Sequence, residues 1–277
     1  MTLASSPWTQ WSFSPLVLAG AVVALAFFFQ GFRRLRARGR ADLAPWSRAV
    51  MFCLGVAVTL FALVGPIDTV GEEYLQSAHM LQHVLVADLG VALTLVAVRG
   101  PLAVFFLPRG LLAPLAHTRW VRRAVALLLR PWVSYAVWVA VLVGWHVPVA
   151  YEAALSNQVV HTFEHLSFVA AGLLVWTQIV DPTGHRRLSV GERAGYTALV
   201  FWTGQILAYV VAFSPEVLFD PYVEQPDRLL GLSPLTDQKL AAVVMMVEQA
   251  ATLGVAFLLL YRRANTERAA KAAGQPV

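Results

Sequence analysis

The chain has 277 residues, of which 58% are hydrophobic and 13% are charged, and its mean hydropathy is positive. So apolar a composition is unusual for a soluble domain, and it predicts an integral membrane protein. Attraction to anionic lipid explains the net charge of +5 better than a nucleic-acid partner does, so the lipid bilayer is the expected partner and nucleic acid is not.

Seven apolar runs have the length and composition of membrane-spanning helices. A run of about 20 apolar residues crosses roughly 30 Å of hydrocarbon as a helix, and none of the runs alternates like a strand of an outer-membrane barrel. We therefore predict an all-α polytopic membrane protein with a single domain over residues 1–277. We expect its seven transmembrane helices near residues 15–32, 49–67, 79–98, 132–149, 159–180, 194–213 and 239–261.

The first run, residues 15–32, is preceded by no Lys or Arg and is followed by five Arg between residues 33 and 40. This is the reverse of a secretory signal, so we expect a retained helix with its N-terminus outside. In that orientation 19 of the 21 Lys and Arg lie on cytoplasmic segments, and only Arg228 and Lys239 lie outside. We therefore predict an outside N-terminus and a cytoplasmic C-terminus, with a basic tail over residues 262–277.

The second run, residues 49–67, contains Cys53, which is the only cysteine of the chain. A single thiol excludes an intramolecular disulfide and a CxxC motif. We expect Cys53 to be buried, because an unpaired Cys usually behaves as a small apolar residue.

The segment of residues 110–130 follows the third run and combines Leu and Ala with Arg119, Arg122, Arg123 and Arg130. Such a mixture of basic and apolar residues is typical of a helix that lies on the membrane surface. We therefore predict an interfacial helix here rather than an eighth span.

Five histidines are predicted to meet at the outer ends of three consecutive spans. His79 and His83 begin the third span, His146 ends the fourth, and His161 and His165 begin the fifth. Four residues make about one helical turn, so both rings of a pair project from the same face. Consecutive helices with short connections are usually neighbours, and ionisable groups inside spans tend to mark functional sites. The sequence therefore predicts one metal or cofactor site that these five imidazoles share.

Three methionines affect the choice of metal. Met80 follows His79, and Met245 and Met246 lie about two turns inside the seventh span. Imidazole binds zinc, copper, iron and nickel, whereas a thioether favours Cu(I). Met more often fills gaps between packed helices, but together with the histidines these side chains favour copper over zinc or haem iron.

Three acidic residues lie inside predicted spans. Glu164 lies near the face of His161, and three roles are open for it: to bind the metal, to orient an imidazole or to take a proton. Asp88 comes nine residues after His79, about half a turn away, so we expect it to face the opposite side and to lie outside the cluster. Glu248 on the seventh span is an auxiliary candidate, and two roles remain open for it: part of a proton or ion path, or a polar contact between helices.

Residues 161–165 also match H-x-x-E-H, the inverted zincin motif in which two His bind zinc and Glu is the base. One alternative is therefore an intramembrane zinc metallopeptidase that uses His161, Glu164 and His165. Two others are a haem-binding protein with axial histidines and a copper transporter. A transporter would need polar residues that continue to the inner face, where only Glu248 and Gln205 are candidates.

Four segments, residues 79–83, 145–155, 161–165 and 231–238, occur in this order from the third span onward. In these segments the chain resembles the seven-helix CtaG-type cytochrome c oxidase assembly factors. The resemblance implies a non-enzymatic protein of the bacterial plasma membrane that helps copper to reach a haem-copper oxidase subunit. It also implies partners, namely that subunit and an extracytoplasmic copper donor. The outer loop of residues 214–237 either contacts such a partner or only covers the bundle.

Overall fold

The structure is a computed structural model, and it describes residues 6–108, 110, 113–114, 117–184 and 187–274. The described residues form helices and no strands. The predicted all-α class is therefore confirmed.

The helices vary widely in length, and two of the long ones contain a π-helical segment. The helices are α1 (Pro15–Ala37), α2 (Trp46–Val64), α3 (Pro66–Glu73), α4 (Gln76–Val84), α5 (Gly90–Ala97), α6 (Pro101–Phe106), α8 (Arg119–Leu128), α9 (Pro131–Trp145), α10 (Pro148–Ser156), α11 (Gln158–Val180), α12 (Val190–Phe213), α13 (Asp220–Glu224), α14 (Pro234–Gln249) and α15 (Val255–Ala272). The π-helical segment Leu85–Leu89 joins α4 to α5, and Ala250–Gly254 joins α14 to α15.

Six helices of the described chain are long and apolar enough to cross a membrane, and a seventh span results if α8 and α9 cross together. The six are Pro15–Ala37, Ala41–Val64, Gln76–Ala97, Gln158–Val180, Val190–Phe213 and Pro234–Ala272. Their apolar windows are only 17% to 44% buried inside the protein. Apolar surface left outward on this scale is expected when lipid is the solvent, so the chain is a multi-pass membrane protein.

The fourth predicted span, residues 132–149, ends earlier than expected. Helix α9 stops at Trp145, and Pro148 begins α10. A residue that precedes proline avoids the α region, and Val147 is indeed extended, with φ −73° and ψ 126°. Alone, α9 is about 22 Å long, which is too short to cross the roughly 30 Å of hydrocarbon. It is long enough only together with α8, and the two helices are bent by 75° where they meet.

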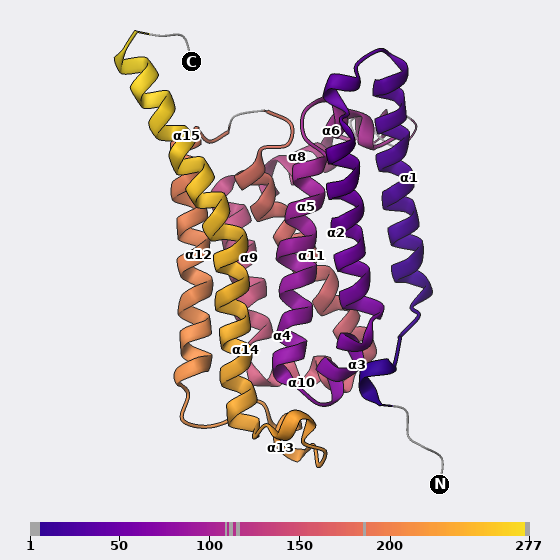
Figure 1. Ribbon diagram of the computed structural model, residues 1–277, viewed down its shortest axis with the longest axis vertical. Coiled ribbons are helices and arrows are strands. Elements are labelled where there is room, and N and C mark those ends of the chain that lie inside the picture. Colours follow the sequence, from indigo (N-terminus) through magenta and orange to yellow (C-terminus); the bar gives the residue numbers. More distant parts are fainter. Residues whose placement is uncertain (1–5, 109, 111–112, 115–116, 185–186, 275–277) are drawn as a thin grey trace.

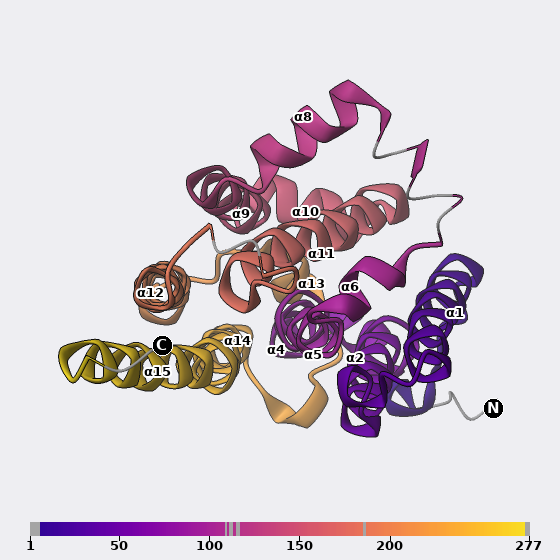
Figure 2. The same cartoon turned by 90° about the horizontal axis from the view of Figure 1, so that it is seen from above.

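The predicted surface helix is present in part. Helix α8 covers Arg119–Leu128 and has no buried residue, and in the view from above it lies away from the other helices (Figure 2). Residues 109, 111–112 and 115–116 of the predicted segment lie outside the described residues. The last span is longer than predicted, because α15 continues to Ala272 through most of the predicted basic tail.

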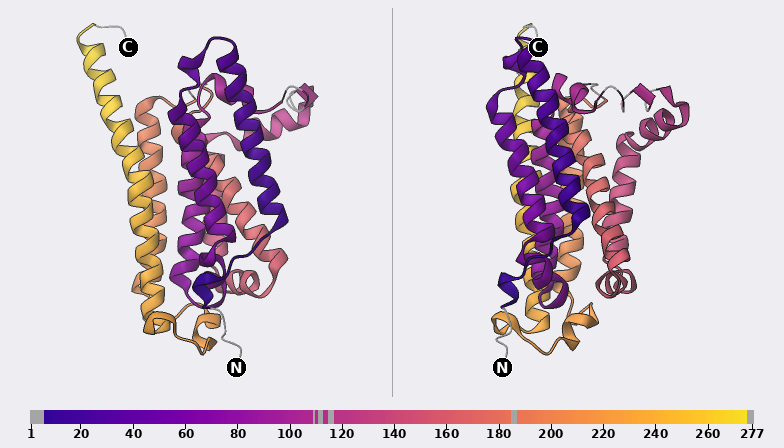
Figure 3. Two further views of the ribbon diagram at one scale, coloured as in Figure 1. Left: turned by 45° about the vertical axis from the view of Figure 1, so that its right-hand side comes forward. Right: turned by 90° about the vertical axis from the view of Figure 1, so that its right-hand side faces the viewer.

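The helix formed by α4, the π segment and α5 lies at the centre of the bundle (Figure 2). It packs against α2 on one side, against α14 on another and against α11 on a third. Helices α3, α10 and α13 lie at one end of the bundle with the first turns of α4 and α11, and α6 and α8 lie at the other (Figures 1 and 3). We call the first of these the histidine end. Helix α1 begins at this end, and α15 extends past the opposite one.

The two ends differ in what fills them. At the end opposite the histidine end, α1, α2 and α6 enclose an aromatic core in which Phe28 stacks on Phe52 with 4.2 Å between ring centroids. Cys53, the neighbour of Phe52, is exposed on the outer side of α2. The expectation that it would be buried was wrong, because its side of α2 faces away from the core.

Candidate functional site: a buried histidine cluster

The first turn of α4, which carries His79, is held in place by two neighbouring segments. Helix α3 approaches so closely that a Cβ on Gly71 would lie 2.8 Å from the backbone of His79, so only glycine fits there. From α14, Asp237 accepts hydrogen bonds from the Gln76 and Ser77 amides at 2.6 and 3.3 Å, and from the Ser77 hydroxyl at 2.5 Å. These amides are the free donors at a helix start, so Asp237 caps α4 from another helix and fixes the position of His79.

Helix α11 brings the second pair of histidines. Asn157 caps it by accepting hydrogen bonds from the Val159 and Val160 amides at 2.9 and 3.2 Å. His161 is one turn further on and is 3% exposed. Its Nδ1 lies 2.9 Å from Oε1 of Glu72 on α3. Since the carboxylate accepts, Nδ1 carries the proton in the neutral ring, and Nε2 keeps a free lone pair.

Four imidazole rings form a closed circuit, and we call His79, His83, His161 and His165 the histidine cluster. The ring centroids are 4.3 Å apart for His79 and His83, 5.7 Å for His79 and His161, 5.0 Å for His83 and His165, and 4.2 Å for His161 and His165. The Nε2 atoms of His79 and His83 are 2.6 Å apart. Two residues four apart on each of two packed helices therefore bring four of the five predicted histidines together. The fifth, His146, lies in the wall of an adjoining cavity.

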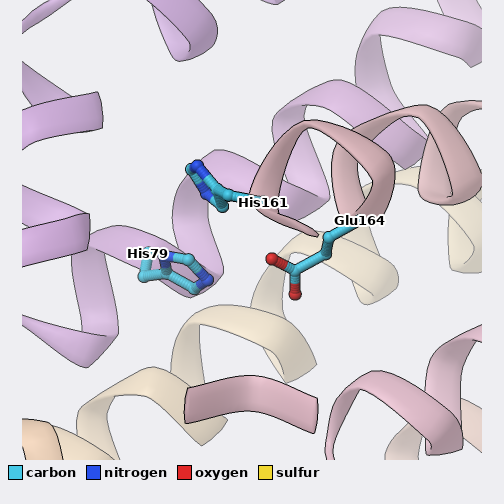
Figure 4. A group of neighbouring side chains, drawn as sticks. All are labelled: His79, His161 and Glu164. Atoms are coloured by element: carbon cyan, nitrogen blue, oxygen red, sulfur yellow. The ribbon is translucent and has the colours of Figure 1, made fainter. Parts of the chain in front are cut away.

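Glu164 adds a carboxylate to the histidine cluster. It is 1% exposed, and its Oε1 lies 3.6 Å from Nε2 of His83. One ligand atom from each of His79, His161 and Glu164 lies within 4.8 Å of the other two. Figure 4 shows these three side chains directed toward a common space. Two imidazoles and a carboxylate at this separation can hold a transition-metal ion.

Several polar atoms of the site have no hydrogen-bond partner among the described residues, although they are buried. They are Nδ1 of His79, Nδ1 of His83, Nε2 of His146, Nε2 of His161, Oε2 of Glu164 and Nε2 of His165. A buried polar atom left without a partner costs free energy, so nearly all such atoms in folded proteins are satisfied. So many unsatisfied polar atoms close together are expected where a ligand completes the site.

A cavity of about 60 Å³ lies beside the histidine cluster and reaches toward the middle of the bundle. His83, His146, Met80 and Met245 line it. The Nδ1 atom of His146 lies 2.7 Å from the Leu142 carbonyl, which leaves its buried Nε2 as the free acceptor. Of the two methionines predicted as auxiliary residues, Met245 lies at the site because it lines this cavity, and Met246 does not line it.

Asp88 also lines this cavity, on the wall deeper in the bundle. The prediction treated residues 79 to 98 as a regular helix, which placed Asp88 opposite His79. The π-helical segment Leu85–Leu89 inserts an extra residue, which rotates the following side chains by about 100°. Asp88 is outside the group of His79, His161 and Glu164, but it shares the cavity with His83.

Sequence reasoning missed Glu72 and Asp237 as parts of the site, and it also missed Asp68. Asp68 accepts hydrogen bonds from the Gln82 amide at 2.5 Å and from the Ser12 hydroxyl at 2.6 Å, and burial raises the pKa of its carboxyl group. All three lie outside the predicted spans. One signal could have found them. Acidic residues on short outer segments lie at the same level as the polar residues on the first turns of the spans, and the two sets can therefore form hydrogen bonds.

Residues 214–237 pack over the histidine end. Within this segment Phe219 stacks on Tyr151 with 3.9 Å between ring centroids, and Tyr151 in turn lies 5.2 Å from the His79 ring. The Tyr222 hydroxyl donates to the Gly71 carbonyl at 2.9 Å and lies 3.1 Å from the Tyr151 hydroxyl. Burial raises the pKa of both tyrosines, so both remain neutral phenols. The segment thus forms one wall above the histidine cluster.

A family profile described as cytochrome c oxidase caa3 assembly factor matches residues 26–266. The match covers nearly all of the described bundle and includes the histidine cluster, Glu72 and Asp237. No curated protein and no solved structure matches the chain.

Proposed function

Because the chain belongs to the cytochrome c oxidase caa3 assembly factor family, we propose that it assists oxidase assembly by holding a copper ion at the histidine cluster and passing it to a haem-copper oxidase subunit. In this proposal copper is the cargo of the protein rather than a permanent cofactor. The histidine end faces the outside of a bacterial plasma membrane, where copper would arrive from an extracytoplasmic donor.

The set of buried atoms without partners carries this proposal. Imidazole nitrogens from α4 and α11 are buried without hydrogen-bond partners in the part of the chain that the structure describes, and so is one carboxylate oxygen of Glu164. Ordinary helix packing would satisfy these atoms, because each unsatisfied group costs roughly 1–3 kcal/mol. A metal ion that accepts their lone pairs removes this cost, so the cluster is better suited to a ligand than to structural support.

The chemistry of the donor set favours copper. Imidazoles dominate the histidine cluster, and the sulfur-bearing side chains of Met80 and Met245 line the adjoining cavity. Imidazole suits several divalent metals, whereas a thioether adds selectivity for Cu(I). The chain has no second cysteine with which Cys53 could form a thiolate pair. A site of His and Met is therefore the copper site that this sequence can build.

Glu72 connects the cluster with the surface of the histidine end. Its side chain is 28% exposed, whereas that of His161, with which it pairs, is 3% exposed. A partly exposed carboxylate attracts an arriving cation and also orients the imidazole behind it. We propose that copper passes Glu72 before it reaches the buried nitrogens. Residues 214–237 would then form the contact surface for the copper donor or the oxidase subunit.

The test is to measure the metal bound by the protein purified in detergent from copper-replete cells. Copper, zinc and iron are quantified together in the unchanged chain, in His79→Ala, in His161→Ala and in the matched control His117→Ala, which removes an exposed histidine outside the cluster. We expect copper to be retained by the unchanged chain and by His117→Ala and to be lost from the other two. Copper-free protein, together with normal copper content in the oxidase of cells that lack the gene, would refute the proposal.

The same samples test the alternatives. A zinc metallopeptidase would retain zinc in Glu164→Gln and lose only its proteolytic activity, because Glu would act as the base. A haem protein would show visible absorption bands that vanish in His79→Ala or His161→Ala. Both outcomes differ from a protein that carries copper and shows no haem bands.

A further inference from the structure

A second buried polar site lies deeper in the bundle, where the two π-helical segments meet. Asp88 is in the segment Leu85–Leu89, and Thr252 is in the segment Ala250–Gly254. The Thr252 hydroxyl lies 3.0 Å from Oδ2 of Asp88, and the Trp176 indole donates to Oδ1 at 2.5 Å. Asp88 is 12 residues into its span, or about 18 Å from the start. The site therefore lies near the middle of the apolar layer.

Glu248 completes this site from α14. Both of its carboxylate oxygens are buried without a hydrogen-bond partner among the described residues. The Thr252 hydroxyl that donates to Asp88 also lies 3.1 Å from the Glu248 carbonyl oxygen, so one side chain joins the two acidic residues, and their carboxyl groups interact. Two carboxyl groups can form a hydrogen bond only if one of them carries a proton, because an ionised carboxylate is only an acceptor. Two neighbouring ionised carboxylates would also repel each other in a medium of low polarity.

No basic side chain compensates the pair. In the described part of the chain, no Lys or Arg forms an ion pair with Asp88 or Glu248. The other polar groups near the pair are neutral. Trp176 is on α11, and Thr252 and Gln249 are on the helix that carries Glu248. Gln249 is hydrogen bonded to Gln205 on α12 at 3.1 Å. A buried carboxylate without a cation is costly inside a membrane, so the pair requires a positive charge from another source.

The cavity gives this site a connection to the histidine end. Asp88 lies in its wall, and so do His83, which is 5% exposed with an unpartnered Nδ1, and His146, with an unpartnered Nε2. A cavity of about 60 Å³ exceeds the roughly 10–15 Å³ that one water molecule needs. The cavity wall is mostly apolar, and a water molecule inside it can hydrogen bond to the Asp88 carboxyl group and to an imidazole nitrogen of His83 or His146.

We propose that Asp88 and Glu248 form a proton-binding site in which the two carboxyl groups share one proton, exchanged with the histidine end through the cavity. The site is distinct from the copper site and does not depend on copper being bound. It gives the protein a proton store about half-way across the membrane, which is separated from the histidine cluster by a water-sized gap rather than by packed apolar side chains.

The test is infrared spectroscopy of the metal-free full chain in lipid nanodiscs at neutral pH. A protonated carboxyl group has a C=O stretching band that is separate from the bands of a carboxylate, and the band shifts in D₂O. We expect this band in the unchanged chain, its loss in the double variant Asp88→Asn with Glu248→Gln, and a shift in either single variant, because the partner of the proton has changed. Glu164→Gln should retain the band, and Thr252→Val should only shift it.

Each other result overturns the proposal. A band that survives in the double variant comes from a different acid, and a band lost in Glu164→Gln comes from the histidine cluster. A band that is absent in the unchanged chain, or that appears only when sodium and potassium are removed, means that the pair binds an alkali cation instead of a proton. Leu142→Phe, which enlarges a side chain in the cavity wall, should slow the exchange with D₂O, whereas Leu142→Met should not. Equal rates in these two variants would exclude the cavity as the route.

Discussion

Two sets of buried polar groups lie side by side at the histidine end, and they differ in how completely they are hydrogen bonded. The carboxylates of Asp237 and Asp68 each accept hydrogen bonds on both oxygens. The histidine cluster is equally buried, but most of its rings retain a nitrogen without a partner among the described residues. The difference indicates that burial and polarity alone do not identify a functional site. Saturated groups fix the positions of helices, and unsaturated groups are free to bind.

Glu72 lies between these two classes, because it is partly exposed and orients His161. Replacing it in Glu72→Gln removes the charge that fixes the ring tautomer. We expect metal affinity to fall about 10-fold to 100-fold, the usual effect of losing a partner that orients a metal ligand. The affinity is measured by competition with a chelator of known strength. The exposed neighbour variant Glu73→Gln is the control and should bind normally. Equal affinities in the two variants would place Glu72 outside the site.

Asp237→Asn tests the saturated class. The amide offers one acceptor oxygen and one donor nitrogen where two oxygens now accept, so a free amide of α4 loses its partner. We expect the free energy of unfolding to fall by about 1–3 kcal/mol, as measured by thermal unfolding in detergent, and metal affinity to fall less than in Glu72→Gln. Asp227→Asn, at an exposed position in the segment that precedes α14, should change neither. If metal affinity fell as far as in Glu72→Gln while the free energy of unfolding did not change, Asp237 would belong to the groups that bind metal.

Met245→Leu should have the smallest effect of the three. The substitution nearly preserves volume at a side chain that is 2% exposed, so the change in stability should remain below about 1.5 kcal/mol. If Met245 contributes its sulfur, the preference for Cu(I) over Cu(II) should decrease while total metal binding remains. Met246→Leu provides the matched control because that side chain does not line the cavity. Identical preferences in both variants would leave the histidine cluster as the whole site.

The sequence was sufficient to predict what depends on local spacing. Apolar length predicted the spans, and the four-residue spacing predicted that His79 pairs with His83 and that His161 pairs with His165. The all-α membrane class and the family resemblance are confirmed. The orientation of the termini and the copper ion stay predictions, because neither follows from the fold.

The sequence could not predict contacts that depend on how distant helices pack. The pairing of Glu72 with His161 joins residues on α3 and α11, and the Asp237 cap joins α14 to α4. The π-helical segments were missed as well, because neither has a proline or another signal that interrupts the apolar pattern. That omission placed Asp88 opposite His79 and missed the cavity that it shares with His83, although Asp88 does lie outside the group of His79, His161 and Glu164.

The Asp237 cap has a consequence for how the protein is made. The hydrogen bond from the Gln76 amide to Asp237 connects residues 161 positions apart. A membrane protein is inserted from its N-terminus as it is synthesised, so His79 and His161 are both in the membrane well before α14 leaves the ribosome. The first turn of α4 therefore reaches its final position only when the last span has been inserted. An unfinished chain would contain every histidine, but His79 would not yet be held in position. Such a chain would bind metal less tightly than the complete bundle.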